Sequence, residues 1–73
     1  MNATMLTSAE INAGYAAMKA SGSSADFIAG VAARRAITSN AEARAFDVAT
    51  RAALAAADAA GRAESAARRA ARA

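Results

Sequence analysis

The sequence contains no cysteine and no histidine. Without cysteine there is no disulfide and no thiol chemistry, and without either residue type the usual zinc ligands are missing. Histidine is also the side chain most often used for proton transfer near neutral pH. We therefore expect neither a metal site nor a cofactor, and the redox compartment cannot be read from the composition.

Large apolar side chains are also scarce. Leucine, isoleucine, valine and phenylalanine together fill nine of the 73 positions, whereas alanine fills 28. Because an alanine methyl group contributes far less than a leucine side chain, the hydrophobic content of 56% overstates what the chain can bury. Chains of this size bury a smaller fraction of their surface than larger chains do, so burial barely offsets the conformational entropy lost on folding. We expect a single domain that needs support from self-association.

Long apolar runs are missing as well, because no stretch approaches the roughly 18 residues needed to span a bilayer. The net charge is +3, and it is unevenly distributed. Residues 1–58 carry five basic and five acidic groups, whereas residues 59–73 carry four arginines against Glu64 alone. These features predict a soluble, cytoplasmic protein that has a basic C-terminal segment and does not bind membranes.

Three helix-start signals of one type divide the chain. In each, a hydroxyl side chain caps free backbone N–H groups and an acidic side chain three residues later caps in return. The pairs are Thr7 with Glu10, Ser23 with Asp26, and Ser39 with Glu42. The predicted helices cover about residues 8–20, 24–37 and 41–70. The fold class is therefore all-α: a short N-terminal helix followed by a helical hairpin with a long, alanine-rich C-terminal helix, oligomerising by helix packing.

Apolar spacing assigns an inward face to each of the first two helices. In the first helix these residues are Ile11, Tyr15 and Met18. In the second helix they are Phe27, Ile28, Val31 and Ala32. Ser21 and Gly22 end the first helix. Arg34 and Arg35 stand near the C-terminus of the second helix, where cations complement the helix dipole.

The third helix carries a seam of small residues. With Phe46 at position a of a heptad, alanine fills every following a and d position, and the following charges fall elsewhere. This alanine seam consists of Phe46, Ala49, Ala53, Ala56, Ala60, Ala63, Ala67 and Ala70. Small residues allow helix axes to approach inside the usual separation of about 8–10 Å. The seam predicts packing against another helix, most economically from a second copy, although helix propensity and GC-rich coding also favour alanine.

Charged pairs are expected to line the exposed side of this helix. Acid-first pairs four residues apart, each worth a few tenths of a kcal/mol, are Asp47 with Arg51, Asp58 with Arg62, and Glu64 with Arg68. Gly61 costs roughly 1 kcal/mol relative to alanine. We therefore expect the basic residues 62–73 to fray unless a partner covers them.

The candidate functional residues indicate binding rather than catalysis. No carboxylate pair, nucleophile with base, phosphate loop or metal cluster can be assembled, so we do not expect an enzyme. Tyr15 is the only tyrosine and Lys19 the only lysine, one turn further along. Arg44 and Arg51 are two turns apart on one side and could face an anion across a subunit groove. Plainer roles remain open: core packing for Tyr15, solvation for Lys19, and salt bridges for the two arginines.

The order of these features resembles a family of small phage anti-CBASS proteins that act as sponges for cyclic oligonucleotide signals. Leu6, Thr7, Glu10 and Ile11 are similar to that family's Leu-Ser-x-x-Glu-Ile opening. Further similar positions are Phe27, Ile28, Val31, Arg44, Phe46, Val48, Ala49, Thr50, Arg62 and Ala63. The resemblance implies compact helical homo-oligomers, hexameric in that family, which bind cyclic nucleotides between subunits without turnover.

The chain departs from the family pattern at two positions that bind ligand there. Ala3 stands where the family has a tyrosine that stacks on a base. Met18 aligns with a phosphate-binding lysine, which this chain recovers at Lys19 only by a shift of one residue.

These observations predict a small non-catalytic, homo-oligomeric binding protein. In its sharpest form it is a phage anti-defence sponge, in which Lys19, Arg44 and Arg51 contact phosphates of a cyclic oligonucleotide and Tyr15 is the available aromatic ring. The alternative is a helical adaptor or inhibitor that binds a host protein complex or nucleic acid through its arginine-rich C-terminal helix. Arg68, Arg69 and Arg72 would then carry the function.

Overall fold

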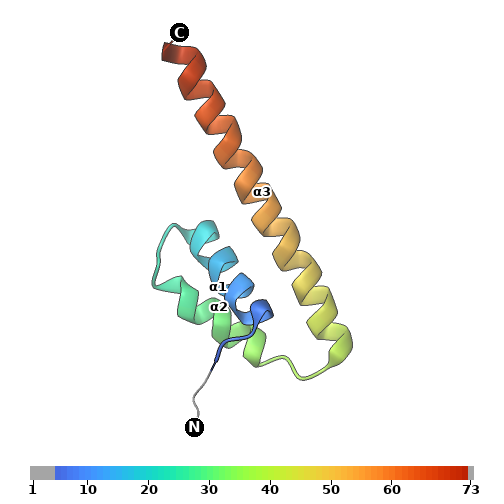
Figure 1. The fold of residues 1–73 in the computed structure, drawn as a ribbon. Helices are drawn as coiled ribbons and strands as arrows, with labels where there is room; N and C mark the ends of the chain where they lie inside the picture. The colour runs from blue at the N-terminus through green and yellow to red at the C-terminus, as the bar shows by residue number, and fades with distance from the viewer. Residues whose placement is uncertain (1–4, 73) are drawn as a thin grey trace.

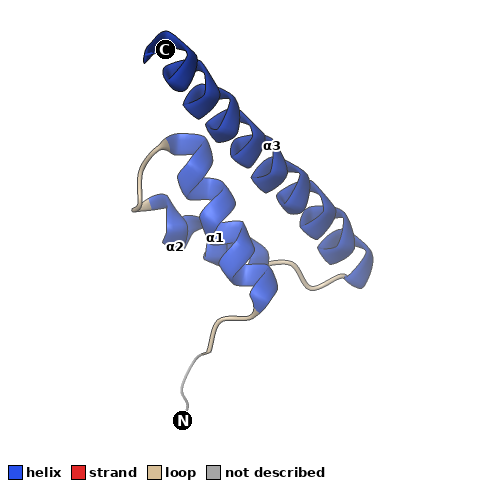
Figure 2. Cartoon of the chain, turned by 45° about the horizontal axis from the view of Figure 1, so that its top comes forward, coloured by secondary structure: helices blue, strands red, loops and turns tan. Residues whose placement is uncertain are grey.

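The computed structural model describes residues 5–72 and contains three α-helices in that part of the chain (Figure 1). They are α1 (Ser8–Ser21), α2 (Asp26–Arg35) and α3 (Asn40–Arg72). Short loops join them, and no strand occurs among the described residues (Figure 2). The all-α fold with a long last helix is confirmed, whereas α2 is shorter than predicted at both ends. Ala3, which bears on the family resemblance, lies outside the described residues.

Both ends of α1 follow the local sequence signals. The Thr7 backbone N–H donates to Glu10 Oε1 at 2.9 Å, and the Glu10 N–H donates to Thr7 Oγ1 at 3.2 Å, which completes the predicted capping box. At the other end Gly22 adopts a φ of 78°, and its N–H donates to the Met18 carbonyl. This left-handed backbone favours glycine, which explains why the helix stops there.

The predicted capping box at Ser23 and Asp26 is wrong. Asp26 is the first residue of α2, and no side chain caps that helix. The Ser23 hydroxyl instead accepts from the Ala25 N–H at 3.3 Å, inside the turn that follows Gly22. Because the left-handed residue redirects the chain, the serines serve the loop rather than the helix end. At α3 the Glu42 N–H does donate to Ser39 Oγ, at 3.3 Å.

Two glycines set the crossing of α1 and α2. A Cβ atom placed on Gly30 would lie 2.8 Å from the Ala13 carbonyl carbon and 2.9 Å from the Gly14 Cα. A Cβ atom on Gly14 would lie 2.6 Å from the Phe27 ring. No ordinary side-chain contact is this short, so the two backbones touch directly. This close crossing buries Ala13 and Val31, which are 4% and 7% exposed.

The core around this crossing is thin. Ala13 and Val31 are the buried apolar residues among those described, and Glu10 and Thr50 are buried beside them. The inward assignment of Ile28 and Ala32 is wrong, since both are exposed, Ile28 at 75%. Gly30 is the residue of α2 whose backbone meets α1, and Ile28 lies on a different side of α2, where it is exposed. The central helix of the packing is α1, which contacts both α2 and α3.

The face of α3 that packs within the chain is not the alanine seam. Its partly or fully buried residues are Ala43, Phe46, Asp47, Thr50, Leu54 and Ala57. The seven alanines of the alanine seam are all exposed. Successive residues differ by about 100° around a helix, and the seam therefore lies to one side of the stripe that meets α1.

The second half of α3 stands clear of the other helices (Figure 1). Every residue from 58 to 72 is exposed, and the helix continues through Gly61 without a break. The molecule measures 53 × 27 × 17 Å, and its long dimension follows α3. None of the described helices has the length and apolar character that a membrane span requires.

Candidate functional site

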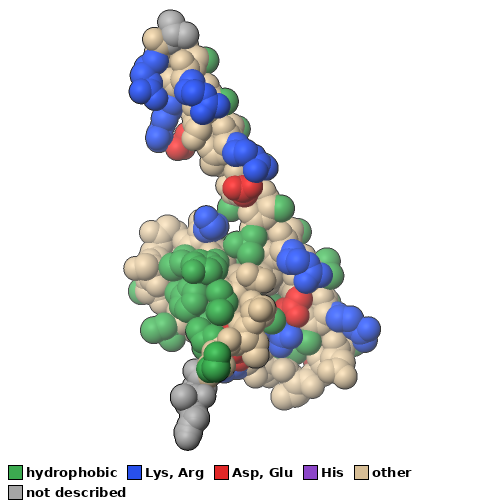
Figure 3. Space-filling model, in the orientation of Figure 1, with side chains coloured by type: hydrophobic (Ala, Val, Ile, Leu, Met, Phe, Trp, Pro, Cys, Tyr) green, Lys and Arg blue, Asp and Glu red, His purple; other side chains and the backbone are tan. Residues whose placement is uncertain are grey.

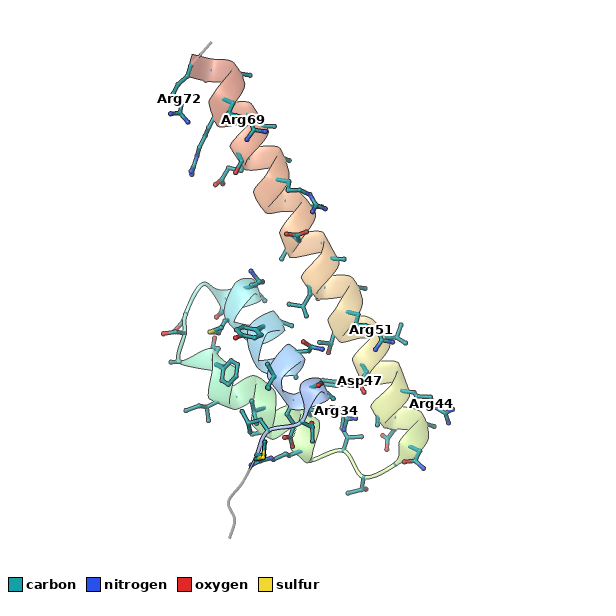
Figure 4. All side chains as sticks on the ribbon, in the orientation of Figure 1. Arg34, Arg44, Asp47, Arg51, Arg69 and Arg72 are labelled. Carbon is teal, nitrogen blue, oxygen red and sulfur yellow. The ribbon has the colours of Figure 1, made fainter. Side chains whose placement is uncertain are left out.

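Two arginines of α2 are occupied by contacts that hold the helices together. Arg34 donates from Nε to Asp47 Oδ1 at 2.7 Å and from Nη2 to Asp47 Oδ2 at 3.0 Å, which links α2 to α3 (Figure 4). Arg35 Nε donates to Glu10 Oε2 at 2.8 Å, which links α2 to α1. Paired donors on one carboxylate give this type of contact its strength and direction.

One ion pair predicted from the sequence is wrong, and the observed contacts shift the pKa values of the groups that form them. Asp47 pairs with Arg34 rather than with Arg51, because the end of α2 presents a guanidinium to both carboxylate oxygens. The hydrogen bond from Arg34 lowers the pKa of Asp47, and the same bond raises the pKa of Arg34. The pKa of Glu10 is lowered chiefly by the backbone hydrogen bond from Thr7, and then by the Arg35 side chain.

The other two predicted pairs are confirmed on α3. Arg62 Nη1 lies 2.6 Å from Asp58 Oδ2, and Arg68 Nη2 lies 2.8 Å from Glu64 Oε1. All four side chains are well exposed, so each pair contributes little to the stability.

The four predicted site residues do not meet in one chain. Tyr15 is 46% exposed, and its ring packs edge-on against Phe27 with the centroids 5.4 Å apart. Lys19 is exposed in the last turn of α1. Arg44 and Arg51 are exposed side chains of α3 (Figure 4), and Arg51 borders a small hollow beside Ser8, Ala9 and Asn12 of α1. Lys19 and Arg51 border different hollows.

Lys19 takes part in a site that the sequence analysis did not identify. A groove of about 600 Å³ lies between the end of α1 and the free half of α3. We call it the cationic groove, and its lining residues are Lys19, Ala57, Asp58, Gly61, Arg62, Ser65 and Arg69. Three basic groups and one acid border it. The seven-residue spacing of Arg62 and Arg69 was the available sequence signal, but the position of Lys19 depends on how α1 packs.

A second hollow, lined mostly by alanine, lies where the three helices meet. It has a volume of about 540 Å³. We call it the alanine-lined hollow, and its lining residues are Ala13, Ala16, Ala17, Asp26, Ala29, Gly30, Ala33, Phe46 and Thr50. Phe46 also begins the alanine seam, so the hollow and the seam are neighbouring surfaces. The short side chains leave open the space that larger ones would fill in a self-sufficient core.

Apolar and basic surfaces are segregated (Figure 3). On the face shown, apolar side chains gather over α1 and α2, whereas most of the basic side chains lie along α3, and the one lysine, Lys19, lies on α1. The large apolar residues that remain exposed are Met5, Leu6, Tyr15, Ile28 and Val48.

No group of three metal-binding side chains occurs within residues 5–72. The arrangement provides charged and apolar contact surfaces. The chain matches no protein-family model, no curated protein sequence and no solved structure.

Proposed function

We propose that this chain is a non-catalytic binding protein that assembles with copies of itself through the alanine seam of α3. The supporting observation is that all seven alanines of the seam are exposed, beside the open alanine-lined hollow. Apolar burial within the chain is slight, so the lone chain gains little hydrophobic stabilisation. A second α3 packed on the seam would remove many methyl groups from water at once.

The charge distribution favours an antiparallel arrangement of two α3 helices. Residues 59–73 carry four arginines and one glutamate, whereas the preceding part of the chain is balanced. A parallel pair would bring both basic ends together, but an antiparallel pair separates them by most of the helix length. Two-fold symmetry, which is commonest among homo-oligomers, is available to both arrangements, so the charge distribution is what favours the antiparallel one.

Glutamate substitutions on adjacent alanines test this assembly. Ala56→Glu places a charge on the seam, and Ala55→Glu places the same charge about 100° away on an exposed face. Native mass spectrometry and sedimentation should show an oligomer for the unmodified chain and for Ala55→Glu, and a monomer for Ala56→Glu. A monomeric unmodified chain, or equal effects of the two variants, would contradict the proposal.

The narrower form of the proposal is a sponge for cyclic oligonucleotides. In it, subunit junctions bring Lys19, Arg44 and Arg51 of different copies to the phosphates, with Tyr15 as the available ring. Cyclic di- and trinucleotides should then raise the melting temperature of the assembled protein, because a ligand that binds only the folded state stabilises it. An assembled protein that responds to none of them would exclude the sponge and leave self-association standing.

A protein-directed adaptor is the second candidate, and the exposure of α3 from residue 58 to residue 72 favours it. Arg68, Arg69 and Arg72 in this free segment could dock on an acidic partner surface. Truncation after Gly61 separates the two functions. It should abolish binding that depends on the basic end, whereas a sponge built on Lys19, Arg44 and Arg51 should retain its ligand.

A further inference from the structure

We infer that the cationic groove is a binding site for the oligophosphate chain of a small ligand. The inference goes beyond self-association, because Arg62 and Arg69 lie on a different side of α3 from the alanine seam. The groove can therefore be occupied whether or not α3 is paired.

Basic groups from two helices converge at this groove. Lys19 comes from the last turn of α1, and Arg62 and Arg69 come from α3, two turns and roughly 10 Å apart along its axis. In the described part of the chain, neither Lys19 nor Arg69 forms an ion pair. With Asp58 as the one acid among the lining residues, the groove carries a net charge of +2.

The lining chemistry fits phosphate. Guanidinium groups offer paired N–H donors to phosphate oxygens, and the lysine ammonium adds a compact charge. Ser65 adds a hydroxyl donor between the two arginines. Gly61 has no side chain to occupy the cationic groove, and, beyond its chain neighbours and the adjacent helix backbone, no atom lies within 4 Å of the position that a Cβ atom would take there.

The pattern of charges favours a compact ligand over a nucleic-acid strand. Asp47 and Asp58 lie on the same side of α3 as Arg51 and Arg62, so the basic track along the helix is interrupted. No aromatic ring lines the groove, and bases would have no surface on which to stack. The groove therefore recognises closely spaced phosphates, whether in free tripolyphosphate or in a nucleoside triphosphate.

Calorimetric titration of the full chain with tripolyphosphate tests the site. The titration is made at roughly 0.15 M salt, where charges more than about 8 Å apart are largely screened. We expect saturable binding, similar binding of ATP, and much weaker binding of orthophosphate. Arg69→Gln and Lys19→Gln should each lower the affinity about tenfold or more, since each removes a charged donor.

Ala41→Glu is the matched control, because it lowers the net charge from +3 to +2, as each of the other two changes does. Ala41 is exposed and lies roughly 24 Å along α3 from Ala57 at the groove. The affinity of the Ala41→Glu variant for tripolyphosphate should therefore stay within about twofold of that of the parent chain. Circular dichroism verifies that each variant is folded. Equal losses in all three variants, a loss confined to Arg69→Gln, or no binding of tripolyphosphate would overturn the inference.

Two further titrations complete the test. Single-stranded DNA that binds more tightly than tripolyphosphate at equal phosphate concentration would overturn the inference in favour of a polymer. Ala56→Glu should bind tripolyphosphate normally even as a monomer, so failure of the groove and failure of self-association give different results.

Discussion

At the scale of single residues, the glycines at the α1–α2 crossing are the least replaceable positions described. Gly30 meets the backbone at Ala13, and Gly14 meets the Phe27 ring. A ring can rotate to relieve an overlap, whereas an overlap with backbone is relieved only by moving the two helices apart, which loosens their packing. Gly30 is therefore the stricter of the two positions.

Alanine substitution should have opposite effects at two helical glycines. Gly30→Ala should lower the free energy of unfolding by about 1–3 kcal/mol or more, because its Cβ atom overlaps the Ala13 carbonyl. Gly61→Ala should raise it by up to about 1 kcal/mol, because Gly61 is exposed and its surroundings are open. Urea unfolding followed by circular dichroism measures both. A Gly30→Ala variant as stable as the parent chain would show that the backbones do not touch.

At the scale of the helices, two ion pairs link α2 to its neighbours. Arg35 with Glu10 links α2 to α1, and Arg34 with Asp47 links α2 to α3. Neither carboxylate can be protonated without weakening the contact between two helices.

Acid should therefore loosen the packing. The folded state lowers the pKa of Glu10 below its ordinary 4.5 and that of Asp47 below its ordinary 3.8. Stabilisation from a lowered carboxylate pKa is complete above the ordinary value and is lost as the pH falls through the folded-state value. The melting temperature should stay level from pH 7 to about 5 and fall below about pH 4.

The double variant Glu10→Gln and Asp47→Asn is the control for this pH dependence. It should melt at a lower temperature at pH 7 but show a flatter profile in acid, measured by circular dichroism. The same acid dependence in parent and variant would assign the effect to other groups.

The two halves of α3 should differ in backbone protection. Residues 43–57 include the face that packs on α1, whereas residues 58–72 are exposed throughout. In the Ala56→Glu variant, amide hydrogens of residues 58–72 should exchange faster than those of residues 43–57. If the parent chain self-associates as proposed, this difference should be smaller there. Equal protection in both proteins would argue against a partner on the seam.

Local signals in the sequence predicted the helices better than their packing. Thr7 with Glu10, and Gly22, mark the ends of α1 because the interactions involved span only a few residues. The capping box predicted at Ser23 and Asp26 is wrong because the Ser23 hydroxyl accepts from the Ala25 N–H inside the preceding turn, which also spans only a few residues. Heptad counting from Phe46 identified the alanine seam as the most regular face of α3. The face of α3 that is buried within the chain is a different one, because it depends on where α1 lies.

The candidate site was less predictable for the same reason. Lys19 and Arg69 are far apart in the sequence, and only the packing of α1 on α3 places both beside one groove. Arg34 and Arg35 looked like ordinary helix-end cations, yet each reaches a carboxylate on another helix. Such pairings depend on the crossing at Gly14 and Gly30, which periodicity does not reveal.

At the scale of the whole molecule, the chain is elongated. Its radius of gyration is 15.2 Å, whereas a compact chain of 73 residues would have about 11 Å. Small-angle X-ray scattering of the monomeric Ala56→Glu variant should give a value near that of the structure. A value near 11 Å would mean that α3 bends back over α1 and α2 in solution.

The free half of α3 also acts as a lever. From Ala57, where contact with α1 ends, the helix extends about 22 Å to Arg72. A tilt of the whole helix by about 10° about Ala57 would move the tip by about 4 Å and would move the start of the packed half by a similar distance across α1. The position of the arginine-bearing end is thus set by how α3 lies across α1, more than about 20 Å away.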